Sequence, residues 1–230
     1  MLLAMGVSCR ELVKKWENSI SGTVGSTERV HTEKGCGMSL DEVIEECKLF
    51  YFVGQETTSN LLTWTMVMLT IHQDWQERAR VEVLQAFRDH QPDYQVLNHL
   101  KTVNMILHEV LRLYLPGTML VRTTQEKIKL GDLALPPEVE LLLPVILIHH
   151  DTELWGSDAK EFNPQRFVDG VANASKNPSA FMPFSLGTRT CIGQNFVMQE
   201  AKMALAMCLQ RFLFELSPSY QHGPFPLLTL

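Results

Sequence analysis

The chain has 230 residues, of which 45% are hydrophobic and 20% charged, as is typical of a globular protein that buries a core. Its 20 basic and 26 acidic residues give a net charge of -6, which argues against nucleic acid as a partner because phosphate binding favours a basic surface. The five cysteines include no C-x-x-C pair, so neither a disulfide framework nor a structural zinc site is expected. No run approaches the roughly 18 apolar residues that a membrane span needs.

The first 37 residues differ in character from the rest. Residues 9–18 have the pattern of a short amphipathic helix, and residues 19–37 are rich in Gly, Ser and Thr, as flexible linkers are. We therefore expect residues 1–37 to form a short helix and a linker, and residues 38–230 to form the domain.

A long helix is predicted next. Ser39 and Glu42 form a capping box, and the apolar run from Val43 to Ile71 predicts a helix that passes through the interior. Gly54 lies in the middle of this run, where glycine costs about 1 kcal/mol relative to alanine. This position therefore calls for a packing or functional reason.

Two further helices follow. Asp74 and Glu77 predict another capping box, which opens a helix to about Phe87. A third helix is expected from about Lys101 to Tyr114.

The second half of the chain is mixed. Residues 118–148 are rich in Val, Leu, Ile and Thr and are interrupted by turn residues, which predicts short strands. A last long helix is expected over about Gln194 to Arg211, followed by a strand at residues 212–216. The predicted fold class is mainly α with a small β-sheet.

The most informative segment surrounds Cys191, in a glycine-punctuated loop just before a helix. The unpaired N–H groups at a helix start favour a thiolate, the form of cysteine that binds metal. Gly187 and Gly193 allow tight bends and close approach to a flat ligand, and Arg189 supplies a charge suited to a carboxylate. A single sulfur suits a cofactor that fills the other metal positions itself, as haem does. The alternative is a buried structural cysteine.

The order Phe184, Gly187, Arg189, Cys191, Gly193 resembles the haem-binding signature of the cytochrome P450 family, F-x-x-G-x-R-x-C-x-G. The resemblance implies that residues 38–230 form the C-terminal, haem-binding portion of the cytochrome P450 fold. It implies haem b as the cofactor, with Cys191 as the axial ligand of its iron.

A second motif of the family lies upstream. Glu109 and Arg112 are three residues apart and share a helix face, where they can pair. Taken alone, such a pair is a common surface feature worth well under ~1 kcal/mol. Arg166, in FNPQRF, resembles the family's second arginine, and the resemblance implies a buried charge triad of Glu109, Arg112 and Arg166 behind the cysteine loop.

A third motif lies in the long helix. The run from Val53 to Thr57 resembles the family's oxygen-activation motif, which implies that Thr57 and Glu56 are catalytic. Thr57 would donate a hydrogen bond to dioxygen, Glu56 would relay protons, and Gly54 would let the helix open over the haem. The alternative is a threonine that bonds its own helix.

Arg122 matches the family position that contacts a haem propionate, and the alternative is a solvent-facing arginine. Leu186 stands where the family usually has glycine, which predicts backbone strain if that position needs a positive φ.

His149, His150 and Asp151 suggest a metal site, but at a strand end adjacent residues would face opposite sides. The family has a similar H-x-D before W-G, matched by His149, Asp151, Trp155 and Gly156, where it is structural.

Two stretches, residues 37–59 and residues 191–207, resemble the plant clan that contains secologanin synthase and related terpenoid hydroxylases. The resemblance implies a monooxygenase of plant secondary metabolism that hydroxylates an apolar, terpenoid-like small molecule. Electrons would come from NADPH only indirectly, through NADPH-cytochrome P450 reductase. Such proteins are anchored on the cytosolic face of the endoplasmic reticulum membrane, whereas this chain, which has no anchor, is expected in the cytosol.

Family members are longer than this chain, and residues 1–37 resemble a remnant of an upstream region. Two alternatives follow. One is a truncated, non-catalytic fragment with weak or no haem binding, and the other is a haem-free helical interaction module.

Overall fold

A computed structural model describes residues 39–223. The chain divides into two units, residues 1–55 and residues 56–230. The helix predicted at residues 9–18 and the linker at residues 19–37 lie outside the described residues, so the domain boundary at residue 37 stays a prediction.

Helix α2 (Leu40–Ile71) begins as predicted. The Ser39 backbone N–H donates to Glu42 Oε2 over 2.7 Å, and the Glu42 N–H donates to Ser39 Oγ over 3.3 Å, which confirms the capping box.

The prediction that this whole helix runs through the interior is wrong. Its consecutive apolar side chains from Leu49 to Val53 are all exposed. The buried positions form one stripe with helical spacing, and they are Thr58, Leu61, Thr65, Met68 and Leu69. Apolar composition on several sides of a helix does not bury those sides, because burial needs a packed neighbour on each of them.

Helix α3 (Gln73–Phe87) has His72 as its N-cap, two residues before the predicted cap Asp74, so the predicted cap is wrong. Only His72 lies between α2 and α3. Its N–H donates to the Met68 carbonyl of α2, and its own carbonyl accepts from Trp75 and Gln76 of α3. Asp74 consequently lies inside the first turn of α3.

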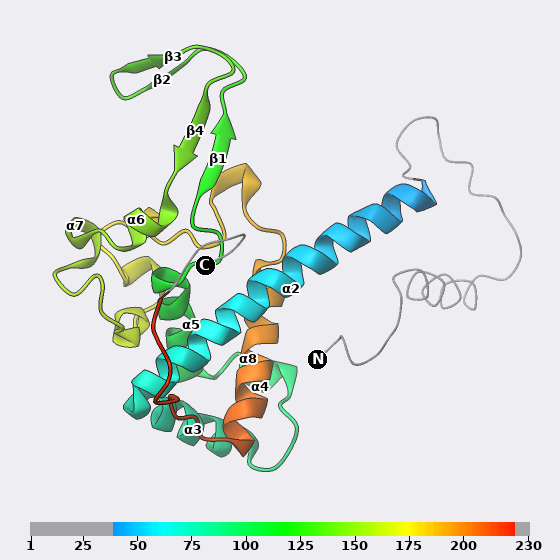
Figure 1. Ribbon diagram of the computed structural model, residues 1–230, viewed down its shortest axis with the longest axis vertical. Helices are drawn as coiled ribbons and strands as arrows, with labels where there is room; N and C mark the ends of the chain where they lie inside the picture. The colour runs from blue at the N-terminus through cyan, green and yellow to red at the C-terminus, as the bar shows by residue number, and fades with distance from the viewer. Residues whose placement is uncertain (1–38, 224–230) are drawn as a thin grey trace, which may run out of the picture. The chain divides into compact units, whose positions relative to one another are not determined.

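Helix α5 (Lys101–Leu113) is the centre of the second unit. It contacts α3, the short helices α6 (Val145–His149) and η2 (Pro164–Phe167), and α8 (Gln194–Arg211), and Figure 1 shows α3, α5 and α8 gathered together. Glu82 of α3 accepts the backbone N–H groups of Thr102 and Val103 at the start of α5, so one helix caps another. Helix α8 has the predicted bounds, and α5 ends one residue early.

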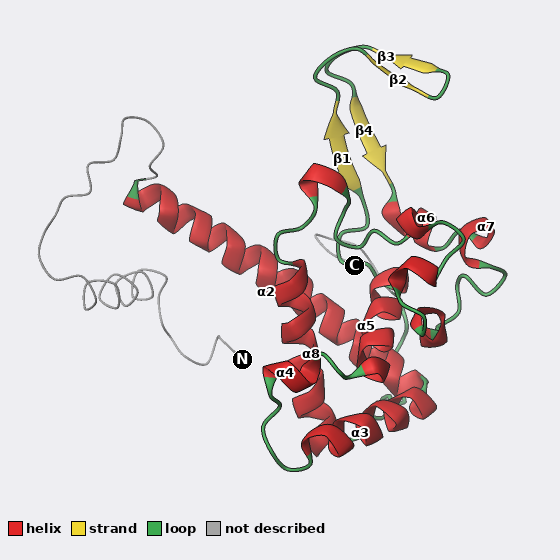
Figure 2. Cartoon of the chain, turned by 180° about the vertical axis from the view of Figure 1, so that it is seen from behind, coloured by secondary structure: helices red, strands yellow, loops and turns green. Residues whose placement is uncertain are grey.

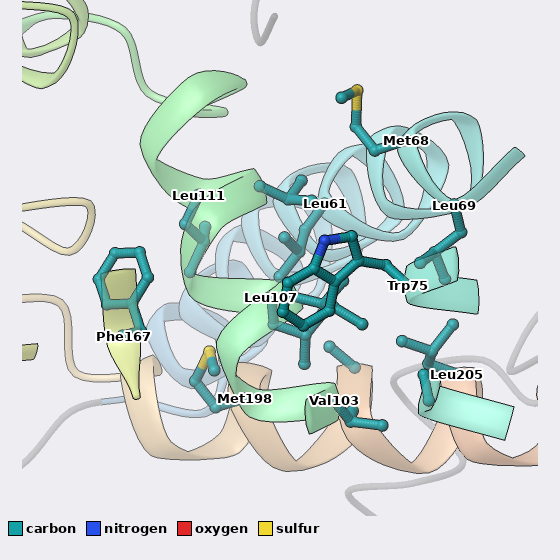
Figure 3. Close-up of a cluster of buried hydrophobic side chains, with 14 of the residues drawn as sticks. Leu61, Met68, Leu69, Trp75, Val103, Leu107, Leu111, Phe167, Met198 and Leu205 are labelled. Atoms are coloured by element: carbon teal, nitrogen blue, oxygen red, sulfur yellow. The ribbon is translucent and has the colours of Figure 1, made fainter. Parts of the chain in front are cut away.

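The hydrophobic core is built where these helices meet (Figure 3). Burying one such side chain contributes about 1.5–3 kcal/mol, so this cluster holds the unit together. Each principal helix contributes to it, through Leu61, Met68, Leu69, Trp75, Val103, Leu107, Leu111, Met198 and Leu205, and η2 adds Phe167.

The predicted small sheet is a pair of two-stranded antiparallel ladders along one hairpin (Figure 2). Strand β1 (Leu120–Thr123) pairs with β4 (Glu140–Leu143), and β2 (Ile128–Leu130) pairs with β3 (Leu133–Leu135). The fold class is mainly α with a small β-sheet, as predicted.

The strand expected at residues 212–216 is not formed. Its backbone is extended at Phe212, but the groups that a strand partner would take are bound elsewhere. Gln76 Oε1 accepts the Phe214 N–H over 2.8 Å, and Gln76 Nε2 donates to the Phe214 carbonyl over 3.0 Å. A buried glutamine side chain therefore takes the place of a neighbouring strand.

Short helices also form in segments for which no helix was predicted. They include α4 (Tyr94–Leu97), α7 (Thr152–Trp155), η3 (Val171–Asn173), η4 (Pro178–Ala180) and η5 (Gly187–Arg189). Within residues 39–223, no helix has the combination of length and apolarity that a membrane span requires.

Candidate functional site

The paired charges Glu109 and Arg112 lie on α5 with both side chains fully buried. Arg112 Nε donates to Glu109 Oε2 over 2.8 Å, and Arg112 Nη2 donates to Glu109 Oε1 over 2.7 Å. This two-point geometry is the strongest that an arginine and a carboxylate make. The alternative of a surface ion pair is therefore wrong.

The remaining N–H groups of Arg112 all reach backbone carbonyls. Nη1 donates to His149 over 2.8 Å and to Ala159, and Nη2 donates to Glu161 over 3.1 Å. A guanidinium has five N–H donors, and here all five are used. Arg112 thereby fixes three points of the chain between α6 and η2.

The third predicted member, Arg166 of η2, lies at the same carboxylate but is held mainly by another acid. Its Nε is 3.5 Å from Glu109 Oε1, an ion-pair distance without hydrogen-bond geometry. Its Nη2 is 2.6 Å from Asp158 Oδ2, and its Nη1 donates to the Trp155 carbonyl over 2.9 Å. The structure thus brings the three predicted residues together and adds Asp158. These four residues form the α5 charge network.

Asp158 was not among the residues predicted from the sequence, although a count of the charges points to it. One carboxylate and two guanidinium groups leave a buried triad with an excess positive charge, which is costly away from water. A second carboxylate neutralises that excess. The nearest acids before Arg166 in the chain are Asp158 and Glu161, and of these Asp158 supplies the carboxylate.

The segment of His149, Asp151, Trp155 and Gly156 has structural contacts. Asp151 caps α7 by accepting the Glu153 N–H over 2.7 Å, and the Trp155 ring lies 5.1 Å from the Arg112 guanidinium. His149 lies at the end of helix α6 and not of a strand, so the strand assumed for it is wrong. Among residues 39–223, no group of three metal-binding side chains is found.

His149 connects the charge network to the cysteine loop. Its carbonyl accepts from Arg112, and its ring Nε2 accepts the Met182 backbone N–H over 3.1 Å. The ring also stacks on Phe181, with centroids 5.6 Å apart. Burial, with Arg112 also nearby, lowers the pKa of His149 to about 3, so the ring stays neutral and able to accept.

The cysteine loop itself is shaped by backbone hydrogen bonds. The Cys191 N–H donates to the Phe184 carbonyl over 2.8 Å, and the Thr190 N–H donates to the Gly187 carbonyl over 3.2 Å. Phe184 is half-buried against the core, so it anchors the loop. The loop therefore returns on itself just before α8 begins.

The strain expected at Leu186 is absent, because its φ is -139°. Positive φ angles occur instead on either side of it, at Ser185 (64°) and Gly187 (74°). Glycine at 187 adopts this conformation without penalty. The loop therefore needs glycine at 187 for its backbone and tolerates leucine at 186.

Cys191 and its apolar neighbours are presented outward. Cys191 is exposed, as are Leu186 of the same loop, Ile192 (86%) and Phe196 (70%). A Cβ added at Gly193 would lie 3.8 Å from Cys191 Sγ, so a larger side chain there would begin to cover the sulfur. The alternative of a buried structural cysteine is therefore wrong.

Two arginines accompany this sulfur. Arg122 of β1 donates through Nη2 to Ser185 Oγ over 2.9 Å, which ties the sheet to the cysteine loop. Arg189 is exposed within the loop. These groups fit haem part by part. The exposed sulfur suits its iron, the exposed apolar side chains suit its flat apolar ring, and the two guanidinium groups suit its two carboxylates.

The residues of the oxygen-activation motif lie on α2. Glu56 and Thr57 are half-buried, and the next residue, Thr58, is buried. A Cβ added at Gly54 would meet no atom within 4 Å, so packing within the described residues does not explain this glycine. The catalytic roles of Glu56 and Thr57 stay predictions.

Several known proteins have sequences similar to this chain. Residues 18–227 match the family model described as Cytochrome P450. The chain is 62% identical over 200 residues to Cytochrome P450 CYP72A219 of Panax ginseng, covering 87% of this chain and 39% of that protein. It is 52% identical over 211 residues to Secologanin synthase 1 of Catharanthus roseus, covering 92% and 40%.

The chain thus spans about two fifths of the length of these relatives. The family model nevertheless covers most of the chain, including the cysteine loop, the α5 charge network and the α2 motif. The chain belongs to the cytochrome P450 family.

Proposed function

We propose that this chain is the haem-binding part of a haem-thiolate monooxygenase, with Cys191 as the axial ligand of the iron. The observation that carries the proposal is the exposed sulfur of Cys191. The backbone of its loop is bonded at Met182 to His149, which is in turn bonded to Arg112 of the α5 charge network. A thiolate ligand of this kind favours cleavage of the O–O bond when haem is bound.

The residues around Cys191 have separate tasks in this proposal. Arg122 and Arg189 would hold the carboxylates of haem b, since a guanidinium is suited to a carboxylate. Phe184 anchors the loop, Gly187 gives it its turn, and Gly193 leaves the sulfur open.

On α2, we propose that Glu56 moves protons inward and that Thr57 donates a hydrogen bond on the oxygen side. Gly54 would leave room there for a ligand, since no atom lies within 4 Å of its absent side chain. A carboxylate and a hydroxyl in adjacent positions form a short proton path of the kind that general acid–base chemistry uses.

The proposed substrate is an apolar, terpenoid-like small molecule, hydroxylated with electrons that NADPH supplies through NADPH-cytochrome P450 reductase. Similarity to the relative named Secologanin synthase 1 supports a role in plant secondary metabolism. From its membership of the cytochrome P450 family, we propose action at the cytosolic face of the endoplasmic reticulum.

The test is spectroscopic. The chain is loaded with haem, reduced and exposed to carbon monoxide, and the Soret band is recorded for the wild type, Cys191→Ala and Cys208→Ala. Cys208 is the matched control because it lies half-buried on α8, where burial raises the pKa of its thiol. We expect the thiolate-type band in the wild type and in Cys208→Ala, and its loss in Cys191→Ala.

Other outcomes separate the alternatives. The thiolate-type band without product, in the presence of reductase and NADPH, would favour a non-catalytic haem-binding chain. No band in any of the three proteins would overturn the proposal and favour a haem-free interaction module.

A further inference from the structure

Ser185 adopts a backbone conformation that serine disfavours. Its φ is 64°, in the left-handed region, and it is one of three non-glycine residues with positive φ among the described residues. Glycine would adopt this angle without steric penalty, so a serine here calls for a contribution from its side chain.

The Ser185 side chain makes one identified contact, with Arg122. Its Oγ accepts from Arg122 Nη2 over 2.9 Å. The Ser185 backbone N–H donates to the Met182 carbonyl over 3.1 Å, and the preceding carbonyl, of Phe184, accepts from Cys191. The hydroxyl therefore belongs to the same turn that positions the cysteine backbone.

Arg122 is held by neutral acceptors while its charge stays unneutralised. Nη1 donates to the Val121 carbonyl over 2.8 Å, and Nη2 donates to Ser185. No ion pair links Arg122 to an acid in the part of the chain that the structure describes. Within residues 39–223, three of its five N–H donors have no protein acceptor, and a half-buried guanidinium is suited to a carboxylate.

We propose that Ser185 is a positioning residue, which keeps its strained backbone because its hydroxyl fixes Arg122 beside the cysteine loop for a carboxylate of the bound cofactor. This inference rests on the proposed function, since it names haem as the source of the carboxylate. The contact does not depend on haem, because it exists in the chain alone.

The experiment combines a double-mutant cycle with two probes, haemin and its dimethyl ester, which lacks free carboxylates. Ser185→Ala is measured alone and together with Arg122→Ala, and Thr188→Ala is the control, an exposed residue of the same loop. We expect Ser185→Ala to weaken haemin binding about three- to tenfold, the effect of one ordinary hydrogen bond, because the hydroxyl acts on the carboxylate only through Arg122. We expect it to have no effect when Arg122 is already alanine or when the ester is bound.

Ser185→Gly separates strain from positioning. It should weaken haemin binding as much as Ser185→Ala does, because both lose the hydroxyl. It should unfold at a higher temperature than Ser185→Ala, because glycine tolerates the positive φ. Equal weakening of haemin and its ester, or equal effects with and without Arg122, would overturn the inference.

Failure of the proposed function is recognised independently. If the wild type binds no haemin, that function fails, and the cycle is then judged by the thermal unfolding of the haem-free chain. Coupling between Ser185→Ala and Arg122→Ala in the melting temperature would support the proposed positioning of Arg122 by Ser185, and strict additivity would overturn it.

Discussion

The α5 charge network and the cysteine loop are opposite kinds of structure. In the network, Glu109 and Arg112 are fully buried, and every N–H of the Arg112 guanidinium has an acceptor. In the loop, Cys191 and its apolar neighbours Ile192 and Phe196 are exposed. The charges of the network pair with one another among the described residues, whereas the loop presents groups that a ligand can use.

The difference shows how rigidity is supplied to an exposed site. An exposed loop has few contacts of its own and is open to local motion. Here the loop is held at Met182 by His149 and at Ser185 by Arg122, and His149 is in turn bonded to Arg112. Substitutions in the network should therefore affect the fold, and substitutions at the loop surface should affect the ligand.

The largest effect is expected for Glu109→Ala. It leaves the buried Arg112 charge without its carboxylate and should lower the free energy of unfolding by about 3–5 kcal/mol. Urea unfolding at neutral pH measures this loss. Asp74→Ala is the control, since its 3.7 Å pair with Arg78 is exposed and should contribute less than about 1 kcal/mol. Similar losses in the two variants would contradict the comparison.

The next largest effect is expected from acidification, which should lower the free energy of unfolding through the buried His108 of α5. Burial lowers the pKa of His108 to about 4, with Lys202 adding to the effect, against an ordinary value of 6.5. Between those values the unfolded chain binds the extra proton, so stability is full above pH 6.5 and falls as the pH falls toward 4. The slope approaches about 1.4 kcal/mol per pH unit for this histidine.

His108→Phe tests this dependence, because it removes the titrating group and keeps an aromatic ring where the His108 ring already packs against Phe167. Urea unfolding across the pH range should show a shallower slope for this variant. His99→Phe, which changes an exposed histidine, should leave the slope as it is. An unchanged slope in His108→Phe would rule out this cause.

A smaller effect is expected for His149→Phe, which keeps an aromatic ring but removes the acceptor for the Met182 N–H. An unpaired, half-buried N–H should cost about 1–3 kcal/mol at neutral pH. Amide hydrogen exchange should show faster exchange at Met182, whereas the amides of α8 change less. Unchanged protection at Met182 would mean that His149 does not hold the loop.

The smallest effect on stability is expected for Cys191→Ser. An exposed side chain without packing partners should change the free energy of unfolding of the haem-free chain by no more than about 0.5 kcal/mol. Thermal unfolding of that form provides the measurement. A large loss would show that Cys191 supports the fold, and the contrast between network and loop would then be wrong.

Local patterns in the sequence predicted much of this architecture. The capping box at Ser39, the bounds of α8 and the short strands follow from residue spacing and turn residues. The pairing of Glu109 with Arg112 follows from their separation of three residues on one helix. These features depend on neighbours close in the chain, which a sequence displays directly.

Other features depended on residues far apart in the chain. Asp158 joins the charge network, Gln76 binds the segment where a strand was expected, and His149 receives the Met182 N–H. The exposed first part of α2 could not be inferred from its apolar composition.

The sequence by itself determined the family, the helical character and the identity of the sulfur in the cysteine loop, because these are carried by residue types at set spacings. The tertiary structure alone decided that Cys191 is exposed, that Arg112 uses all its donors, and that the strained residue is Ser185 and not Leu186. The reason is that burial, hydrogen-bond completion and backbone strain are properties of a packed arrangement, in which each group is defined by neighbours that the linear order does not specify.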